Sequence, residues 1–206
     1  IYIWFFKNKK LTNIWLYYYI IRVINLKMNK KVISNLNNRS IVLIGMMGVG
    51  KTTIGKMLSD ELKFPFYDSD KEIEKNLGKE INDIFNDYGE VFFRKEELGF
   101  FKKNINNEQI IISSGGGSFI NREIREKIKK DCISIWLKAN KETLIERLKN
   151  KKNRPLLNVD NFEDTLSLLL NERNAIYEEA DITITIDKLD KAKILQAIIK
   201  SLESLK

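Results

Sequence analysis

The residues with the clearest chemical potential are 45–52, Gly-Met-Met-Gly-Val-Gly-Lys-Thr, which match the pattern GxxxxGK[ST] in full. Glycines permit a tight loop whose amides point inward, and a following helix offers its positive end to phosphate groups. Lys51 can neutralise β- and γ-phosphates, and Thr52 can offer a hydroxyl to Mg²⁺. A glycine-rich turn is the alternative reading, but a β-branched run, Ile41 to Ile44, precedes the loop and a helical pattern follows it. The loop therefore predicts nucleotide phosphate binding.

Two aspartates, Asp68 and Asp70, follow the next apolar run, Phe64 to Tyr67. Beside a phosphate loop, one carboxylate can hold a hydrated Mg²⁺ and the other can reach an acceptor hydroxyl. Alone, Asp-Ser-Asp is also typical of a helix N-cap, here for a helix in the 70s. The position directly after a strand favours the functional interpretation.

Three glycines and two arginines are weaker candidates for ligand binding. Gly115, Gly116 and Gly117 follow a third apolar run and have no side chains, so a ligand can approach their backbone, although a permissive turn would look the same. Arg94 can form a fork for a carboxylate or can pair with Glu90 or Glu97. Arg173 has the same two possibilities beside Glu172.

A polar, basic stretch from Lys149 to Arg154 precedes Pro155. Such a stretch is suitable for a mobile lid that closes over phosphate. As an isolated feature it is equally typical of a solvated basic loop.

Short apolar runs alternate with amphipathic stretches from Ser40 onward, which predicts one α/β domain. We expect five parallel strands covered by helices on both faces, a three-layer α/β/α P-loop fold with a mobile lid and a helical substrate-binding segment. The strands are expected at residues 41–44, 64–67, 110–112, 133–137 and 182–186. Ligands in such sheets bind beyond the carboxyl ends of the strands, where the residues above lie.

Composition excludes several other chemistries. The chain of 206 residues has no histidine and a single cysteine, Cys132, so Ser-His-Asp triads, His-ligated metals, Cys-cluster metals and an intramolecular disulfide are excluded. The net charge of +8 comes from the first 40 residues, which hold eight basic and no acidic side chains. The remaining body balances 28 positive against 28 negative residues, so we expect no nucleic-acid partner.

The basic segment, residues 1–39, is interpreted as an extension that is disordered or lies upstream of a native start at Met28, with the domain at 40–206. Its longest uncharged run, eleven residues from Leu11 to Ile21, is too short for a transmembrane helix. An interfacial membrane anchor and an organelle-targeting peptide are the less favoured alternatives.

In combination these residues resemble the shikimate kinase family, small P-loop kinases of the nucleoside-monophosphate-kinase type. The resemblance covers nearly all of residues 40–188. It is carried by GMMGVGKTTIG (45–55), FYDSDKEIE (66–74), Gly89-Glu90 with Phe93-Arg94, SGGGS (114–118), Arg147, RPLL (154–157) and NER…YEEAD (171–181).

The resemblance implies a role for each matching residue. Asp70 would orient or deprotonate the acceptor hydroxyl, Thr52 would ligate Mg²⁺ directly, and Asp68 would do so through water. The residues implied to bind ATP are Gly48, Val49, Gly50, Lys51, Thr52, Thr53, Arg147 and Arg154, of which Lys51 and Arg154 are also catalytic. Those implied to bind shikimate are Asp70, Arg94, Gly115, Gly116, Gly117 and Arg173.

The implied activity is Mg-dependent transfer of the ATP γ-phosphoryl group to the 3-hydroxyl of shikimate, in chorismate and aromatic amino acid biosynthesis. We expect a cytoplasmic monomer. The alternatives are a gluconate or nucleotide kinase of the same fold, or a catalytically silent, shikimate-kinase-like binding module.

Overall fold

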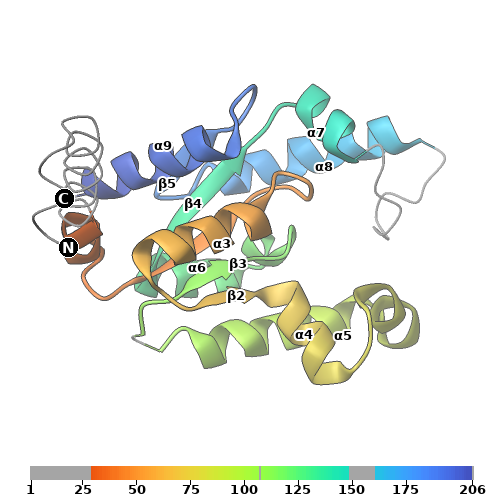
Figure 1. Cartoon of the computed structure of the whole chain (residues 1–206). Helices are drawn as coiled ribbons and strands as arrows, with labels where there is room; N and C mark the ends of the chain where they lie inside the picture. The colour runs from red at the N-terminus through yellow and green to blue at the C-terminus, as the bar shows by residue number, and fades with distance from the viewer. Residues whose placement is uncertain (1–28, 107, 149–160, 206) are drawn as a thin grey trace, which may run out of the picture.

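Five parallel strands form one sheet at the centre of the molecule (Figure 1). The computed structural model describes residues 29–106, 108–148 and 161–205. The strand order is β2-β3-β1-β4-β5. The strands are β1 (Ser40–Ile44), β2 (Phe66–Asp68), β3 (Ile111–Ser113), β4 (Cys132–Lys138) and β5 (Ile182–Thr185). The sequence therefore located all five, with ends that differ by one or two residues.

The burial of each strand follows from its place in the sheet. All five residues of β1 are buried, because this central strand has helices on both sides. The edge strand β5 alternates buried and exposed residues, the pattern of a strand with one covered face. Residues at the ends of β1, β2 and β3 are aligned by the register, which pairs Leu43 with Ser113 and Asp68 with Ser113. The loops that follow these three strands therefore lie together.

Helices cover the two faces of the sheet. Right-handed crossovers place α3 on the face opposite α5, α6 and α8, and the contacts of α3 with α9 and of α5 with α6 agree with this arrangement (Figure 1). The bounds are α3 (Lys51–Leu62), α4 (Ser69–Leu77), α5 (Ile81–Asn104), the 3₁₀ turn η1 (Ser118–Ile120), α6 (Arg122–Asp131), α7 (Lys141–Leu148), α8 (Phe162–Tyr177) and α9 (Lys191–Glu203). The predicted three-layer α/β/α fold is confirmed.

Helix α5 contains a break at a glycine. Gly89 has φ 78° and ψ 171°, a conformation outside the helical region, so two helical segments meet at a kink there. A small separate core joins α4 to both segments of α5, and consists of Ile73 from α4, Ile84 from the first segment and Phe93 from the start of the second. Farther along α5, Phe100 and Phe101 pack in the main core instead.

A helix before β1 changes the expected start of the folded body. Residues 29–36 are helical, and their Val32 and Leu36 side chains are fully buried in the main core. The Asn35 amide also donates to the carbonyls of Leu202 and Glu203 at 3.3 and 3.0 Å, at the end of α9. Residues 29–39 thus lie with the body rather than with an extension that ends at residue 39. The sequence missed this because two apolar residues four apart are a weak signal inside a basic segment.

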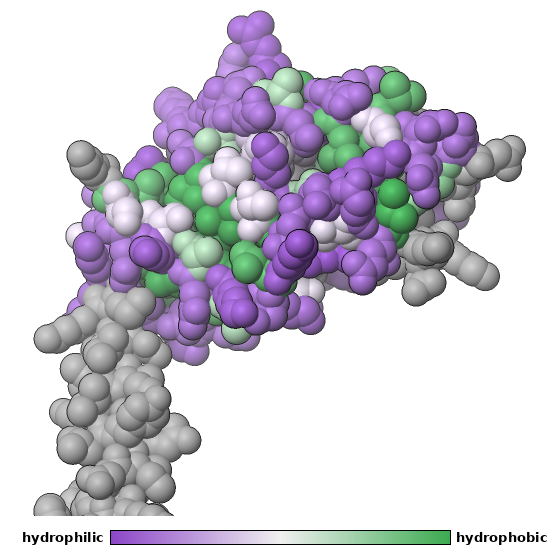
Figure 2. Space-filling model, turned by 90° about the horizontal axis from the view of Figure 1, so that it is seen from above, coloured by the Kyte–Doolittle hydropathy of each residue, from purple (hydrophilic) through white to green (hydrophobic). Residues whose placement is uncertain are grey.

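The face of the molecule that is seen from above is mainly hydrophilic (Figure 2). Figure 2 shows apolar residues in small patches between polar side chains. Among the described residues, the large apolar side chains that are exposed are Ile33, Tyr88, Val91 and Leu168. None of the helices in the described ranges has the length and apolar character needed to cross a bilayer.

Candidate active site

The phosphate loop joins β1 to α3 in the geometry that the glycine pattern predicts. Gly45, Gly48 and Gly50 have φ values of +132°, +84° and +97°, a region that side-chain-bearing residues rarely adopt. The loop can turn tightly at these positions and leads into the amino-terminal end of α3, where backbone N–H groups have no partner within the helix. This end of the helix is suited to an anionic ligand.

Lys51 begins α3 and is buried, with 8% of its surface exposed. Its ammonium group donates to the carbonyl oxygens of Gly45 and Met46 at 2.7 and 2.9 Å. These contacts hold a positive charge across the base of the loop.

Three oxygen-bearing side chains meet beside Lys51. The Thr52 hydroxyl donates to Asp68 Oδ2 at 2.6 Å, and the Thr52 and Ser113 hydroxyl oxygens lie 3.5 Å apart. Asp68 also caps α4, because its Oδ1 accepts from the Lys71 amide at 3.3 Å. The two interpretations of Asp68 are therefore compatible, since one carboxylate oxygen serves the helix and the other faces Thr52.

This oxygen set fits Mg²⁺. Hard hydroxyl and carboxylate oxygens are its preferred ligands, and it usually takes only one or two from the protein and keeps water and phosphate oxygens for the rest. The described residues contain no cluster of three or more His, Cys, Asp or Glu side chains that could hold a metal ion.

A cavity of about 130 Å³ opens over these groups. It is lined by Gly48, Gly50, Lys51, Thr52, Thr53, Asp68, Asp70, Ser113, Ser114 and Gly116. We call it the phosphate cavity. Its walls are polar and combine backbone, hydroxyl and carboxylate groups with one lysine.

A second cavity adjoins the first and contains both candidate arginines. Its lining consists of Met47, Asp70, Ile81, Phe85, Phe93, Arg94, Glu97, Gly115, Gly116, Gly117 and Arg173. We call it the acceptor cavity. Asp70 and Gly116 line both cavities, so a group held in one lies beside a group held in the other.

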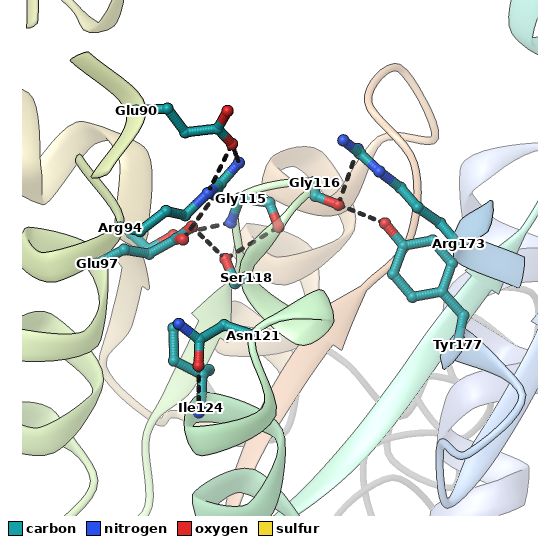
Figure 3. Close-up of polar contacts among 11 residues, drawn as sticks. Glu90, Arg94, Glu97, Gly115, Gly116, Ser118, Asn121, Ile124, Arg173 and Tyr177 are labelled. Carbon is teal, nitrogen blue, oxygen red and sulfur yellow. Dashed lines mark hydrogen bonds and ion pairs between the residues drawn. The ribbon is translucent and has the colours of Figure 1, made fainter. Parts of the chain in front are cut away.

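Carboxylates hold Arg94 at the wall of the acceptor cavity (Figure 3). Its Nη1 donates to Glu97 Oε2 at 2.8 Å, and its Nε and Nη2 donate to Glu90 Oε1 at 3.1 and 2.9 Å. Burial lowers the pKa of the guanidinium, but Glu97 and Glu90 outweigh it and raise the pKa above its ordinary value. The sequence left open whether Arg94 pairs with a glutamate or binds a ligand carboxylate. In the structure Arg94 pairs with glutamates and also lines a cavity, so the two roles are compatible.

Glu97 is completely buried and links Arg94 to the glycine loop. Its Oε1 accepts from the Ser118 hydroxyl at 2.5 Å, and that hydroxyl also contacts the Gly115 carbonyl at 3.0 Å (Figure 3). A buried carboxylate is costly unless it is paired, and here one arginine and one hydroxyl satisfy it. The buried Glu97 therefore fixes the orientation of Arg94.

The three glycines form a closely packed loop. The Gly115 amide donates to Ser69 Oγ at 2.9 Å, and the Gly116 carbonyl accepts from Arg173 Nη1 at 3.2 Å and from the Tyr177 hydroxyl. A Cβ on Gly115 would lie 2.6 Å from Asp70 Oδ1 and 2.7 Å from Glu97 Oε1. The lack of side chains thus allows close approach at this point, as the sequence indicated.

A third, larger cavity lies on the far side of the phosphate loop, lined mainly by apolar surface. Arg147 reaches it from α7 and donates to the Val49 carbonyl at 3.0 Å. Residues Leu189 to Ala192, before and at the start of α9, form the opposite part of the lining. The position and apolar walls suit the base of a nucleotide whose phosphates lie along the loop.

The structure brings together almost all of the site residues that the sequence singled out. Gly48, Val49, Gly50, Lys51, Thr52, Thr53, Asp68, Asp70, Arg94, Gly115, Gly116, Gly117, Arg147 and Arg173 line the three adjoining cavities. Arg154 and the rest of the expected lid lie outside the described residues. Asp70 lies in the first turn of α4.

Sequence reasoning assigned no role to four hydroxyl side chains of this network. Ser69, Ser113, Ser118 and Tyr177 each donate to or accept from a site residue. Ser69 lies between the two aspartates, and Tyr177 lies one helical turn after Arg173, so their positions were available signals. Serine and tyrosine are common in other environments, and residue type alone does not mark them.

The sequence and the structure of this chain are similar to those of known proteins of one family. A family model described as shikimate kinase matches residues 47–203. The chain belongs to the shikimate kinase family. A shikimate kinase from Bartonella henselae is 40% identical over 86% of this chain and 84% of its own length. The structure of a shikimate kinase from Acinetobacter baumannii in complex with shikimate aligns with a TM-score of 0.78 and 36% identity, covering 82% of this chain and 96% of that one.

The family is distinct from others that share its fold. A gluconokinase from Sinorhizobium meliloti aligns with a TM-score of 0.51 over 80% of this chain and 91% of its own, but is only 16% identical. That similarity concerns the fold alone. Membership of the shikimate kinase family therefore rests on sequence over the whole site region.

Proposed function

We propose that this chain is an ATP-dependent shikimate kinase, which transfers the γ-phosphoryl group of ATP to the 3-hydroxyl of shikimate and releases shikimate 3-phosphate and ADP. The observation that carries the proposal is the junction of the two cavities at Asp70 and Gly116. One cavity is suited to phosphates and the other offers two arginines to a carboxylate. A small anionic polyol in the second cavity would present a hydroxyl to phosphate in the first.

The phosphate side supplies charge and position. Phosphoryl transfer needs little covalent help from a protein, so catalysis comes mainly from orientation and charge stabilisation. We propose that the loop amides from Gly48 to Thr53 bind the phosphates and that Lys51 neutralises their charge. We propose that Arg147 lies against the adenine, and that Arg154 stabilises the transferring group.

A bound Mg²⁺ would neutralise charge on the phosphate oxygens, with Thr52 as a direct ligand and Asp68 as a ligand through water. The Thr52 and Asp68 oxygens lie side by side at 2.6 Å, which supports this assignment.

The acceptor side selects and orients the substrate. We propose that Arg94 and Arg173 bind the carboxylate of shikimate and that the glycine loop contacts its ring hydroxyls. Asp70 would orient the reacting hydroxyl and take its proton as the oxygen bonds to the γ-phosphorus. The bond from that phosphorus to the bridging oxygen of ADP breaks, and ADP leaves with the electron pair.

Two rival functions differ from this proposal in testable ways. A gluconate or nucleotide kinase of the same fold would use a different acceptor. A catalytically silent module would be expected to lack Lys51, Asp70 or Arg154, and the chain contains all three.

An ADP-release assay on the purified full chain with MgATP tests the proposal. Turnover is expected to require shikimate and to be lost in Asp70→Asn purified in parallel, which excludes a contaminating kinase. Comparable turnover with gluconate or a nucleoside monophosphate would contradict the proposed acceptor. A size-exclusion measurement on the same sample tests the expected monomer.

A further inference from the structure

We propose that Tyr177 is a positioning residue for the acceptor cavity, which acts through the carbonyl group of Gly116. The inference rests on the proposed function, because it assigns the cavity to shikimate. The Tyr177 hydroxyl and Arg173 Nη1 both donate to this one carbonyl oxygen (Figure 3). The two donors are four residues apart on α8 and so lie on the same face of the helix.

Tyr177 does not touch the space where substrate would lie. It is absent from the residues that line the phosphate and acceptor cavities, whereas Arg173 and Gly116 line the acceptor cavity. Its side chain is 1% exposed and packs against the Trp136 ring, with the ring centroids 5.8 Å apart. The phenol is therefore held in place by the core of the molecule and reaches the site only by its hydroxyl.

The hydroxyl remains a hydrogen-bond donor throughout the neutral pH range. Burial raises the pKa of Tyr177 to about 12, against an opposing effect of the Arg173 charge. A buried phenol without a partner would be costly, and Gly116 supplies that partner. Without Tyr177, the Gly116 carbonyl would keep only the hydrogen bond from Arg173.

The glycine loop needs such external support. Glycine has no side chain to restrict its backbone, so the orientation of the Gly116 carbonyl depends on the groups that bond to it. Because the peptide unit is planar, this orientation also sets the direction of the Gly117 amide at the wall of the acceptor cavity. Tyr177 thereby fixes backbone that the substrate would meet.

The shared carbonyl also concerns Arg173. A guanidinium has five N–H donors, and Arg173 uses one of them on Gly116. With Tyr177 as a second donor, the loop does not depend on Arg173 alone, and the remaining donors of Arg173 can face a ligand carboxylate. Without the phenol, Arg173 would have to hold the Gly116 carbonyl alone and also bind the ligand carboxylate.

The test is Tyr177→Phe, which removes one oxygen atom and keeps the ring. Loss of one buried hydrogen bond predicts that KM for shikimate rises about three- to tenfold, while kcat and KM for ATP stay within about twofold. The matched control is Tyr67→Phe, because the Tyr67 hydroxyl makes no hydrogen bond with the described residues. The control is expected to leave all three constants unchanged.

A purely structural role would lower the melting temperature of Tyr177→Phe without a change in KM for shikimate, and that result would overturn the inference. If the variant melts below the assay temperature, the constants are measured at a lower temperature where circular dichroism shows it folded. If the chain without substitutions shows shikimate-dependent turnover and Tyr177→Phe has the same KM for shikimate, only the role of Tyr177 is rejected. A lack of shikimate-dependent turnover by the unchanged chain would reject the proposed function and the inference with it.

A double-mutant cycle provides a second test. Tyr177→Phe and Arg173→Lys are measured singly and together for shikimate affinity. Because both residues donate to the same carbonyl, their effects are expected to be non-additive. Additive effects would show that Tyr177 does not act through Gly116 and would overturn the inference.

Discussion

The phosphate and acceptor cavities adjoin each other but are built by different means. The phosphate cavity depends on backbone, with glycines at positive φ values and a lysine that bonds to loop carbonyls. The acceptor cavity depends on side chains, in which Arg94 is fixed by two glutamates and Arg173 by a backbone carbonyl. Backbone amides suit any phosphate, whereas positioned arginines select a carboxylate of particular geometry. We infer that the side chains of the acceptor cavity, rather than the backbone of the phosphate cavity, determine which acceptor binds.

Asp70 belongs to both cavities, so its substitution should have the largest effect. In Asp70→Asn the amide keeps the size of the side chain but cannot take the hydroxyl proton. We expect kcat to fall by about 10²–10⁴-fold, the range for loss of a positioned general base. Steady-state kinetics with shikimate provides the measurement. Nucleotide affinity, measured by ADP titration, should stay unchanged, and a parallel loss of ADP binding would contradict the proposed role of Asp70 at the acceptor hydroxyl.

Arg94→Ala should show most clearly that the two cavities bind different ligands. We propose that Arg94 binds the substrate carboxylate, so its removal should weaken shikimate binding by roughly 2–5 kcal/mol, with ADP affinity unchanged. Calorimetric titration of each ligand measures both effects. Arg122→Ala is the matched control, because Arg122 pairs with Glu126 on an exposed helix surface. Near-normal shikimate affinity in Arg94→Ala would remove this residue from the site.

Glu97→Gln tests whether the support of Arg94 matters as well as its charge. Hydrogen bonds to charged groups contribute about 1.5–3 kcal/mol, so KM for shikimate should rise by about ten- to a hundredfold. Glu90→Gln is the control, because its side chain is 57% exposed and Glu97 is fully buried. The buried glutamate should have the larger effect. Equal effects of the two variants would show that burial of Glu97 does not position Arg94.

Gly48→Ala examines the backbone side of the comparison. Gly48 has a φ of +84°, where a Cβ costs roughly 1–2 kcal/mol, and the added carbon would lie 2.8 Å from the Leu148 side chain. Of the four substitutions, Gly48→Ala is expected to have the smallest effect: KM for ATP should rise and shikimate affinity should stay the same. Steady-state kinetics measures KM for ATP, and titration of the nucleotide-free variant with shikimate measures the shikimate affinity. A selective loss of shikimate affinity would contradict the division between the cavities.

The sequence predicted best where local pattern and function coincide. The phosphate loop was located in full, because glycines, lysine and threonine at fixed spacing between a strand and a helix leave little freedom. Asp68 was read as either a cap or a metal ligand, and the structure shows a cap whose second oxygen faces Thr52.

Long-range contacts account for what the sequence did not predict. Val32 and Leu36 are buried by elements far along the chain, which no local pattern in a basic segment indicates. Tyr177 acquires its contact with Gly116 only when α8 lies beside the loop after β3. The roles of residues 1–28 and of Arg154, the monomeric state and the cytoplasmic location stay predictions.

A crystal structure of the full chain with MgADP and shikimate tests the central claim most directly, namely that the acceptor cavity holds the substrate with its reacting hydroxyl at Asp70. The account predicts the carboxylate of shikimate between Arg94 and Arg173, and the 3-hydroxyl within hydrogen-bond distance of Asp70 and directed toward the phosphate cavity. Shikimate bound outside this cavity, or with its carboxylate away from both arginines, would contradict it.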